Sequence, residues 1–346
     1  MKKIAVVAYE TNAAVCSSMM MHVEMMNDAG FNVTLYLHEA VPVKYFSSYN
    51  IIKHQYSSFK ELRSWLSENK EDCIWCTNSL YVLLLRVHRI KLPVYIWQQG
   101  DGPAESYMRH HNRLRCFVLK KILRYAFKTV SGTIFVSDSM RDYYIQNYRY
   151  NKPSAVVPCL SEFSGVEVSV DKIPNSFVYI GGLSVWQCFD EILLLYKRIR
   201  KPNSVFHIIT LDKETAISKV KSIIGSLDGI EIYSITDRKK IPEILNKFQF
   251  GFLVRKDDVV NLVSSPIKFL EYLSCGINVI MTEAVPAYAE IVKKYKIGTV
   301  VRLEDDHIVI NEFSDNAKDV YNQLFDRGLY VRRYKKLMQS NESCNR

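Results

Sequence analysis

Residues 250–280 contain the two stretches that decide the fold, Phe250-Gly-Phe-Leu-Val-Arg-Lys-Asp-Asp258 and Ser264-Ser-Pro-Ile-Lys-Phe-Leu-Glu-Tyr-Leu-Ser-Cys-Gly-Ile-Asn-Val-Ile280. The apolar runs Phe250–Val254 and Asn278–Met281 predict buried strands. Between them, Ser265 is expected to cap a helix that Pro266 opens. Strand, helix and strand in succession are typical of an α/β protein with a parallel sheet covered by helices.

The same alternation runs through all 346 residues, which is longer than a single core usually reaches. We therefore predict two doubly wound, Rossmann-like domains, at residues 1–165 and 170–318, joined by a polar stretch. Ligands bind at the carboxyl ends of such strands, so a cleft between the two sheets is the expected site. A final helical segment, about 319–346, is a candidate to pack back on the first domain. Strands are predicted at Ile4–Tyr9, Phe31–Leu37, Cys73–Cys76, Val94–Trp97, Thr133–Val136, Ala155–Val157, Phe177–Ile180, Val205–Leu211, Ile230–Tyr233 and Thr299–Val301, besides the two named above.

Composition excludes several classes of protein. Hydrophobic residues make up 48% and charged residues 24%, as in ordinary globular proteins, which argues against disorder, collagen and coiled coil. No apolar run reaches the roughly 18–20 residues that span a bilayer. The apolar N-terminal run reads as a strand rather than a signal peptide. The eight cysteines are too few for a disulfide scaffold, and Cys73 and Cys76 lack a partner pair at zinc spacing, so we interpret them as core thiols in a reducing, cytosolic protein.

The net charge of +10, from 46 Lys and Arg against 36 Asp and Glu, requires an explanation. A basic excess suits an anionic partner, which here means nucleic acid, a membrane surface or a phosphorylated ligand. A solvated basic surface without a partner explains the composition equally well.

The stretch at 250–280 carries the chemistry. Arg255 and Lys256 follow a predicted strand, and the first-turn amides of the next helix favour an anion. Lys268 adds positive charge in that turn, and Glu271 lies one turn later on the same side of the helix. This pattern suits a diphosphate held by amides and cations, with sugar hydroxyls on Glu271. The alternative is a capped helix with a surface Lys–Glu pair.

The segment Ser265-Pro-Ile-Lys-Phe-Leu-Glu-Tyr resembles the donor-binding motif of glycosyltransferase family 4, a retaining family with the GT-B fold and nucleotide-sugar donors. Weaker similarity covers most of the chain, including Asp28-Ala-Gly-Phe-Asn-Val-Thr-Leu35, Phe135-Val-Ser-Asp-Ser-Met-Arg-Asp-Tyr143 and Val157-Pro-Cys159. The resemblance implies that Glu271 binds the donor ribose and that Lys268 or Arg255 binds the diphosphate. Ser265 and Pro266 complete the implied donor site.

Two departures from the family pattern concern the same site. The family often has a second acidic residue eight positions before Glu271, where this chain has Val263. It also often has Arg and Lys after the first strand of the second domain, where Gly181-Gly-Leu-Ser-Val-Trp-Gln187 supplies Gly182 and Gln187 instead. Arg255 is a candidate to compensate, and Gly181 and Gly182 allow close backbone approach to a phosphate. Two roles are open for Trp186: its ring packs against the base or the sugar of the donor, or it is a buried core residue.

In the first domain, Gly100, Asp101 and Glu105 follow a predicted strand. Asp101 and Glu105 are catalytic candidates that reach acceptor hydroxyls, and the alternative for Asp101 is turn formation. Thr11 and Asn12, after the first strand, are candidate ligand contacts. A retaining reaction needs no enzymic nucleophile, whereas an inverting one makes Asp101 the candidate base. We expect no cofactor and no metal, because no Asp-x-Asp motif lies at a cleft position.

Residues 109–128 contain seven Lys and Arg and no Asp or Glu. On a helix, six of the seven fall in one arc of about 120°. Leu114, Val118, Ile122 and Tyr125 then fall on the opposite side, as a stripe that faces the core. Aromatic residues among cations suit a lipid headgroup interface, and the alternative is a solvated helix. The residues predicted to face a membrane are Arg113, Phe117, Lys120, Lys121, Arg124, Phe127 and Lys128.

Together these features predict a hexosyltransferase-type glycosyltransferase of bacterial-type surface polysaccharide or lipopolysaccharide biosynthesis. It uses a UDP- or GDP-linked sugar and a glycan acceptor, expected to be lipid-linked, at the inner face of the cell membrane. Nucleic acid is not an expected partner, since no RNA- or DNA-binding motif accompanies the charge. The alternatives are a nucleotide-sugar epimerase of the same shape and a nonenzymatic basic protein that binds membrane or nucleic acid.

Overall fold

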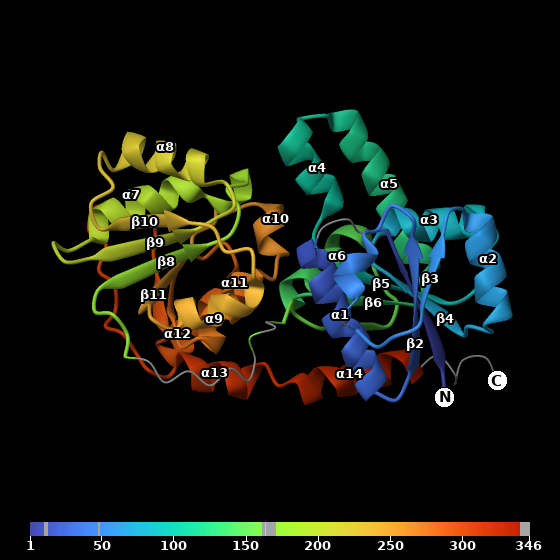
Figure 1. The fold of residues 1–346 in the computed structure, drawn as a ribbon. Coiled ribbons are helices and arrows are strands. Elements are labelled where there is room, and N and C mark those ends of the chain that lie inside the picture. The colour runs from blue at the N-terminus through green and yellow to red at the C-terminus, as the bar shows by residue number, and fades with distance from the viewer. Residues whose placement is uncertain (10–12, 48, 161–162, 164–170, 340–346) are drawn as a thin grey trace. The chain divides into compact units, whose positions relative to one another are not determined.

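The computed structural model describes residues 1–9, 13–47, 49–160, 163 and 171–339. The chain divides into two compact units. The first comprises Met1–Leu160, Val263–Ser265 and the described part of Arg327–Arg346, and the second comprises Ser161–Leu262 and Pro266–Asp326. Each unit is built on its own parallel sheet (Figure 1).

Seven parallel strands, counted over the described residues, form the first sheet in the order β3-β2-β1-β4-β5-β6-β7. Helices cover both faces, so the central strands are buried along their whole length and read as continuous apolar runs. The edge strand Lys53-His-Gln-Tyr56 is polar and half-buried, which is why hydrophobic pattern alone did not predict it. The strands are β1 (Lys3–Ala8), β2 (Asn32–His38), β3 (Lys53–Tyr56), β4 (Cys73–Cys76), β5 (Val94–Gln98), β6 (Gly132–Phe135) and β7 (Ser154–Val156).

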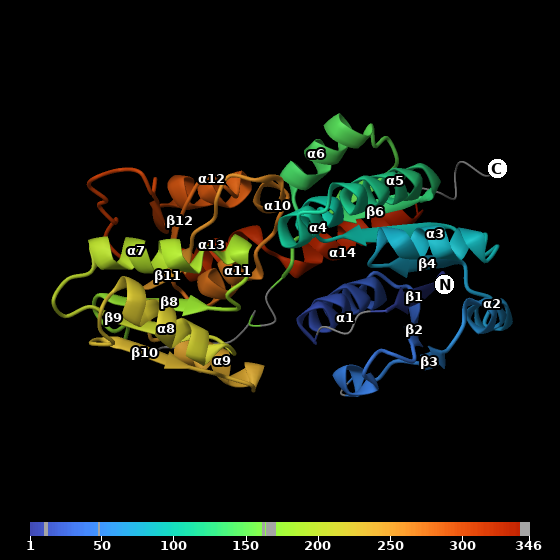
Figure 2. The same ribbon diagram turned by 90° about the horizontal axis from the view of Figure 1, so that it is seen from above.

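The helices of the first unit connect these strands. Helices α1 and α2 lie on opposite faces of β1 and β2 (Figure 2). Helices α4 and α5 pack on each other as a hairpin that extends away from the sheet (Figure 1). The helices are α1 (Ala13–Asp28), α2 (Phe59–Glu68), α3 (Ser79–Val87), α4 (Gly102–His110), α5 (Arg113–Thr129), α6 (Asp138–Tyr148) and α14 (Arg327–Gln339), with the short 3-10 turn η1 (Val43–Phe46).

Helix α14 is remote in sequence from the rest of the first unit but packs on α1 and β7. The Tyr334 hydroxyl lies 2.5 Å from Nδ1 of His22, and Lys2 Nζ donates to the Met338 carbonyl at 2.6 Å. His22 is buried against Trp97, and burial lowers its pKa to about 3, so the ring is neutral. Arg327 closes the contact with ion pairs to Asp28 and Glu24.

The second sheet has six parallel strands among the described residues, in the order β10-β9-β8-β11-β12-β13. This is the arrangement of doubly wound nucleotide-binding sheets, in which the order reverses beside the first strand. Helices α7 and α8 lie on one face, and α11, α12 and α13 lie on the other (Figure 1). The strands are β8 (Ser176–Ile180), β9 (Val205–Ile209), β10 (Ile230–Tyr233), β11 (Phe250–Leu253), β12 (Asn278–Met281) and β13 (Gly298–Val300).

The helices and short turns of the second unit follow the same alternation with its strands. They are η2 (Val185–Gln187), α7 (Phe189–Ile199), α8 (Lys213–Ile223), η3 (Arg238–Lys240), α9 (Ile241–Leu245), α10 (Val259–Leu262), α11 (Ile267–Ser274), α12 (Pro286–Tyr295) and α13 (Ala317–Leu324). In the part of the chain that the structure describes, no helix combines the length and the apolarity needed to cross a bilayer.

The predicted position of Cys73 and Cys76 in the core is confirmed. Cys73 and Cys76 are fully buried in β4. Burial raises the pKa of each thiol to about 12, so both stay protonated and unreactive at neutral pH.

Candidate functional site

Two buried cations of the second unit share one neutral oxygen. Lys268, in the first turn of α11, donates from Nζ to the side-chain oxygen of Gln187 at 2.5 Å. Arg255, which follows β11, donates to that same oxygen at 2.8 Å and to the Gln187 main-chain carbonyl at 3.3 Å. Among the described residues, no carboxylate pairs with either cation. The sequence predicted all three residues for the donor site, and the structure brings them together.

The electrostatics of this pair favour an anionic ligand. Burial, and then the positive charge of Arg255, hold the pKa of Lys268 well below its usual range. Burial likewise lowers the pKa of Arg255. Two buried charges without a counter-ion are costly, and an anion bound beside them relieves that cost.

The glycine loop after β8 approaches Lys268 closely. A Cβ atom added to Gly181 would lie 2.6 Å from Lys268 Cε, and Gly181 has a φ of +134°. Lys268 Nζ also lies 4.1 Å from the centre of the Tyr179 ring, and the Tyr179 hydroxyl donates to the Gly182 carbonyl at 2.5 Å. Tyr179, which the sequence analysis missed, thus links the ammonium group to the glycine loop. Trp186 is half-buried in η2.

Glu271 is buried and paired with a cation that the sequence analysis also missed. Arg238, in η3, donates from Nη2 to Glu271 Oε1 at 2.7 Å. The alternative of a surface Lys268–Glu271 pair is wrong, since both side chains are buried in α11 and Lys268 bonds Gln187. A usable signal for Arg238 was the basic run Arg238-Lys-Lys240 just after the strand Ile230–Tyr233.

Ser265, Pro266 and Lys256 lie differently from what the sequence suggested. Helix α11 begins at Ile267 with Pro266 as its N-cap residue, and no side chain caps it. Ser265 clusters with the first unit, where its hydroxyl oxygen accepts the Cys159 amide at 3.2 Å, so the predicted Ser265 cap is wrong. Lys256 is exposed and pairs with Glu191.

The sequence analysis gave Asp101 two alternative roles, catalysis and turn formation. In the structure, Asp101 shapes the turn that leads into α4. It is the N-cap of α4, where Oδ1 accepts the Ala104 amide at 2.7 Å. The Tyr144 hydroxyl donates to Oδ2 at 3.1 Å. The carboxylate is buried, which raises its pKa.

Glu105 lines a polar pocket of about 280 Å³ at the carboxyl ends of β4 and β5. Its carboxylate lies against Gly100, where a Cβ atom would meet Glu105 Oε1 at 2.2 Å. Burial raises the pKa of Glu105 despite Arg109 nearby. The pocket also carries Asn78, Gln98 and Gln99, groups that hydrogen-bond hydroxyls. Thr11 and Asn12 lie outside the described residues.

Helix α5 exposes its basic face, as predicted, but it also exposes most of the stripe that was expected to face the core. Leu114 is 72% exposed, Phe117 is 56% exposed, and Val118 and Tyr125 are also exposed, so the predicted core stripe is wrong for three of its four members. Phe127, predicted to face a membrane, is 4% exposed and packs on Tyr144. The predicted cations Arg113, Lys120, Lys121, Arg124 and Lys128 are all exposed.

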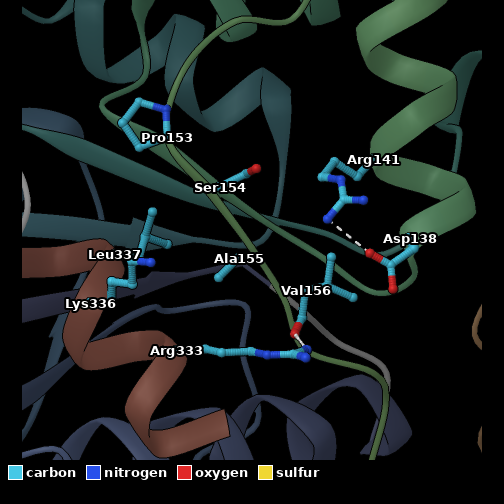
Figure 3. A pocket seen from close by; sticks show the side chains of 9 residues that line it. All are labelled: Asp138, Arg141, Pro153, Ser154, Ala155, Val156, Arg333, Lys336 and Leu337. Carbon is cyan, nitrogen blue, oxygen red and sulfur yellow. Dashed lines mark hydrogen bonds and ion pairs between the residues drawn. The ribbon is translucent and has the colours of Figure 1, made fainter. Parts of the chain in front are cut away.

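A second pocket of the first unit, about 380 Å³, lies beside β7, α6 and α14 (Figure 3). It contains none of the predicted site residues. Arg141 pairs with Asp138 at 2.8 Å, and Arg333 donates to the Val156 carbonyl at 2.5 Å, as Figure 3 shows. Because Arg141 and Arg333 already bond to Asp138 and to the Val156 carbonyl, we assign no ligand to this pocket.

Comparison of structures gives matches over nearly the whole chain. Sucrose-phosphate synthase (tll1590) from Thermosynechococcus elongatus has a TM-score of 0.72 at 11% identity, covering 99% of this chain and 100% of that one. Anabaena Alr3699/HepE, solved with UDP and glucose, has a TM-score of 0.66 at 11% identity over 98% and 100%. A putative UDP-N-acetylglucosamine 2-epimerase from Listeria monocytogenes has a TM-score of 0.61 at 10% identity over 99% and 97%.

No protein-family profile and no curated protein matches the sequence. At these identities the structural matches establish the fold, and the assignment to glycosyltransferase family 4 stays a prediction. Two helix-covered parallel sheets together with these neighbours confirm the predicted fold class: the chain has the GT-B fold.

Proposed function

We propose that this chain is a hexosyltransferase-type glycosyltransferase that moves a sugar from a nucleotide-sugar donor to a glycan acceptor. The observation that carries the proposal is the buried pair Lys268 and Arg255, held on the single amide oxygen of Gln187. A donor diphosphate supplies the negative charge that this pair lacks, and it takes over the role of that oxygen. The solved neighbour with bound UDP and glucose supports a nucleotide sugar as the ligand.

The chemistry assigned to the second unit is stabilisation of the leaving group. The bond between the anomeric carbon and the diphosphate oxygen breaks as the acceptor oxygen bonds the anomeric carbon. In the retaining reaction that we propose, the acceptor hydroxyl gives its proton to the departing phosphate on the same face. Lys268 and Arg255 stabilise the charge that grows on the diphosphate, and we assign this role to no metal. Glu271 orients the ribose.

Acceptor binding is assigned to the polar pocket of the first unit, where Glu105 and the backbone of Gly100 meet. Amide and carboxylate groups of this kind match the hydroxyl groups of a glycan. We retain Asp101 as the base only for an inverting reaction, because its carboxylate caps α4.

The test is a calorimetric titration with UDP and GDP, followed by product analysis with and without a glycan acceptor. We expect one nucleotide to bind and Glu271→Ala to weaken it at least tenfold, because the ribose hydroxyls lose their acceptor. Absence of binding to both nucleotides contradicts the proposal. Conversion of the donor sugar without acceptor instead identifies the alternative, an epimerase, which the Listeria neighbour favours.

We also propose that the α4–α5 hairpin attaches the enzyme to an anionic membrane at the inner face of the cell membrane, which suits a lipid-linked acceptor in surface polysaccharide or lipopolysaccharide assembly. The exposed apolar side chains Leu114, Phe117 and Val118 lie among the cations of α5. Lys121 Nζ lies 5.2 Å from the centre of the Phe117 ring. Cations with an exposed apolar patch suit a headgroup interface, where each basic residue contributes about 1 kcal/mol.

Flotation with vesicles of phosphatidylglycerol and phosphatidylcholine tests the attachment. The double variant Lys120→Glu/Lys121→Glu is expected to lose most of its vesicle-bound fraction, because it changes the charge of the patch by −4. The matched control Lys213→Glu/Lys221→Glu makes the same change on exposed residues of α8 and should float like the wild type. Equal flotation of both variants would show that α5 is not the attachment site.

A further inference from the structure

A third pocket of the first unit, about 280 Å³, lies between α2 and α3 and contains none of the residues assigned above to donor, acceptor or membrane. We infer that it binds one phosphate-bearing group. Four basic side chains, one aromatic residue and one aliphatic residue form its wall, and no Asp or Glu is among these described lining residues. They are Phe59, Lys60, Arg63, Val87, His88 and Arg89.

The three long cations of this pocket lack partners. Lys60, Arg63 and Arg89 are exposed, and within the described part of the chain their side chains make no hydrogen bond or ion pair. Glu61, which follows Lys60 in sequence, accepts hydrogen bonds from the amide and the hydroxyl of Ser57 at 2.8 and 2.9 Å. Helix stability does not explain Lys60, because a cation in the first turn meets the positive end of the helix dipole. Cations gathered around one pocket repel each other, and a bound anion relieves that repulsion.

An aromatic stack holds the two halves of the pocket together. The rings of Phe59, at the start of α2, and His88, at the end of α3, have centres 4.8 Å apart and planes 5° apart. Phe59 also packs on the buried rings of Tyr56 and Tyr81, with centres 6.2 and 5.8 Å away. The pocket therefore exists before a ligand binds, so binding does not have to bring the two helices together.

The lining matches the chemistry of a phosphate. Guanidinium groups bond phosphate oxygens in pairs, and the ammonium group of Lys60 adds a point charge. The volume lies just below the roughly 300 Å³ at which small-molecule sites usually begin, which favours a small phosphate ester. Two sources present this group, the headgroup of an anionic phospholipid and a soluble phosphate ester. Arg86 donates to the Thr129 carbonyl at 3.5 Å, so the end of α3 neighbours the end of α5, the proposed membrane helix.

The His88 ring provides a local readout of this pocket. The experiment is an NMR titration of the full chain, labelled with ¹³C at histidine Cε1, with glycerol 3-phosphate as the ligand. Glycerol at matched ionic strength is the phosphate-free control, and the spectrum of His88→Gln identifies the His88 signal. We expect glycerol 3-phosphate to shift this signal to saturation and glycerol to leave it unchanged. An unchanged signal of the buried His22 shows that the protein is folded.

Two arginine variants test which groups hold the phosphate. Arg63→Gln/Arg89→Gln should weaken binding at His88 at least tenfold, because charge-assisted hydrogen bonds are lost. The matched control Arg200→Gln/Arg302→Gln makes the same charge change on exposed arginines of the second unit and should bind like the wild type. If the double variant does not fold, Arg63→Gln alone answers the same question.

Three results overturn the inference: no response of His88, an equal response to glycerol, or wild-type affinity in the folded arginine variant. The proposed function is tested separately, by UDP and GDP titration of the same protein, because the donor site belongs to the second unit and gives no signal at His88. Either proposal can therefore fail while the other stands.

Flotation with vesicles of phosphatidylglycerol and phosphatidylcholine distinguishes the two sources of phosphate. If Arg63→Gln/Arg89→Gln floats less than Arg200→Gln/Arg302→Gln, the ligand is a lipid headgroup. If both variants float equally and His88 responds to glycerol 3-phosphate, the ligand is a soluble phosphate ester. Reduced flotation without a response of His88 overturns the inference, because the arginines would then act through surface charge and not through a pocket.

Discussion

Lys268→Met is expected to lower the affinity for a nucleoside diphosphate by about 100-fold and to abolish sugar transfer. A hydrogen bond to a charged group contributes roughly 1.5–3 kcal/mol, and Lys268 is one of the two cations that bond Gln187 at the proposed phosphate position. The same substitution should leave the ligand-free protein equally or more stable. Methionine fills a similar volume, and it removes a buried charge that lacks a counter-ion. Nucleotide titration and thermal unfolding measure the two effects.

A loss of nucleotide affinity without a loss of stability would show that Lys268 serves binding rather than folding. Lys256→Met is the matched control, since Lys256 is an exposed cation near the same strand that pairs with Glu191. It should change affinity by less than about threefold, as exposed ion pairs contribute little. A Lys268→Met protein that unfolds more easily and still binds nucleotide would contradict the assignment.

The lowered pKa of Lys268 adds a pH dependence to this prediction. Burial disfavours the charged ammonium in the free protein, whereas a bound diphosphate favours it and raises the pKa again. Binding should therefore take up a proton at pH values above the free pKa, and affinity should fall as pH rises through it. Titrations in two buffers of different ionisation heat measure the uptake, which should be absent in Lys268→Met.

Gly181→Ala is expected to weaken nucleotide binding at least tenfold and to destabilise the second unit by about 2 kcal/mol. A side chain at a φ of +134° is strained, typically by 1–3 kcal/mol. The new Cβ would also lie 2.6 Å from Lys268 Cε, so either the loop or the ammonium group must move. Urea unfolding and nucleotide titration measure the two losses.

The neighbouring glycine provides a matched control for that substitution. No atom lies within 4 Å of a Cβ built on Gly182. Gly182→Ala should therefore change stability by less than about 0.5 kcal/mol, the usual range for unconstrained surface positions. If both alanine variants lose the same stability and the same nucleotide affinity, the close approach of Gly181 to Lys268 contributes nothing to nucleotide binding.

Sequence pattern was sufficient for the strands that are buried on both faces. Cys73–Cys76 and Asn278–Met281 have the predicted bounds, because helices on both sides of a parallel sheet require continuous apolar runs. It was insufficient for β3, whose edge position permits polar residues. The fold class was thus predictable from the central strands, and among the edge strands β10 was predicted with its bounds, β7 and β13 to within one residue, and β3 not at all.

The candidate site was predictable only along one stretch of chain. Lys268 and Glu271 belong to a local motif, so their shared helix turn followed from spacing. Their partners Gln187 and Arg238 are 81 and 33 positions away in sequence, and packing between separate elements brings them together. Periodicity describes one element at a time and contains no information on such contacts.

Helix α5 shows the limit of a helical wheel. The wheel assumes that the whole helix rests on a core, but only its second half does so, through Leu123, Ala126 and Phe127. The first half packs on α4 in a hairpin that extends from the sheet, which leaves Leu114 and Val118 exposed. A helix that leaves the core can expose apolar residues on its side.

Helix α14 also has a consequence for synthesis. It lies at Arg327–Gln339, yet it supplies Tyr334 beside His22 and the carbonyl of Met338 to Lys2. On the ribosome, the second unit is therefore translated before the first can be completed, and residues 1–160 emerge without the helix that packs on α1 and β7. A fragment that ends before α14 should consequently depend on chaperones or aggregate, although it contains the entire first sheet.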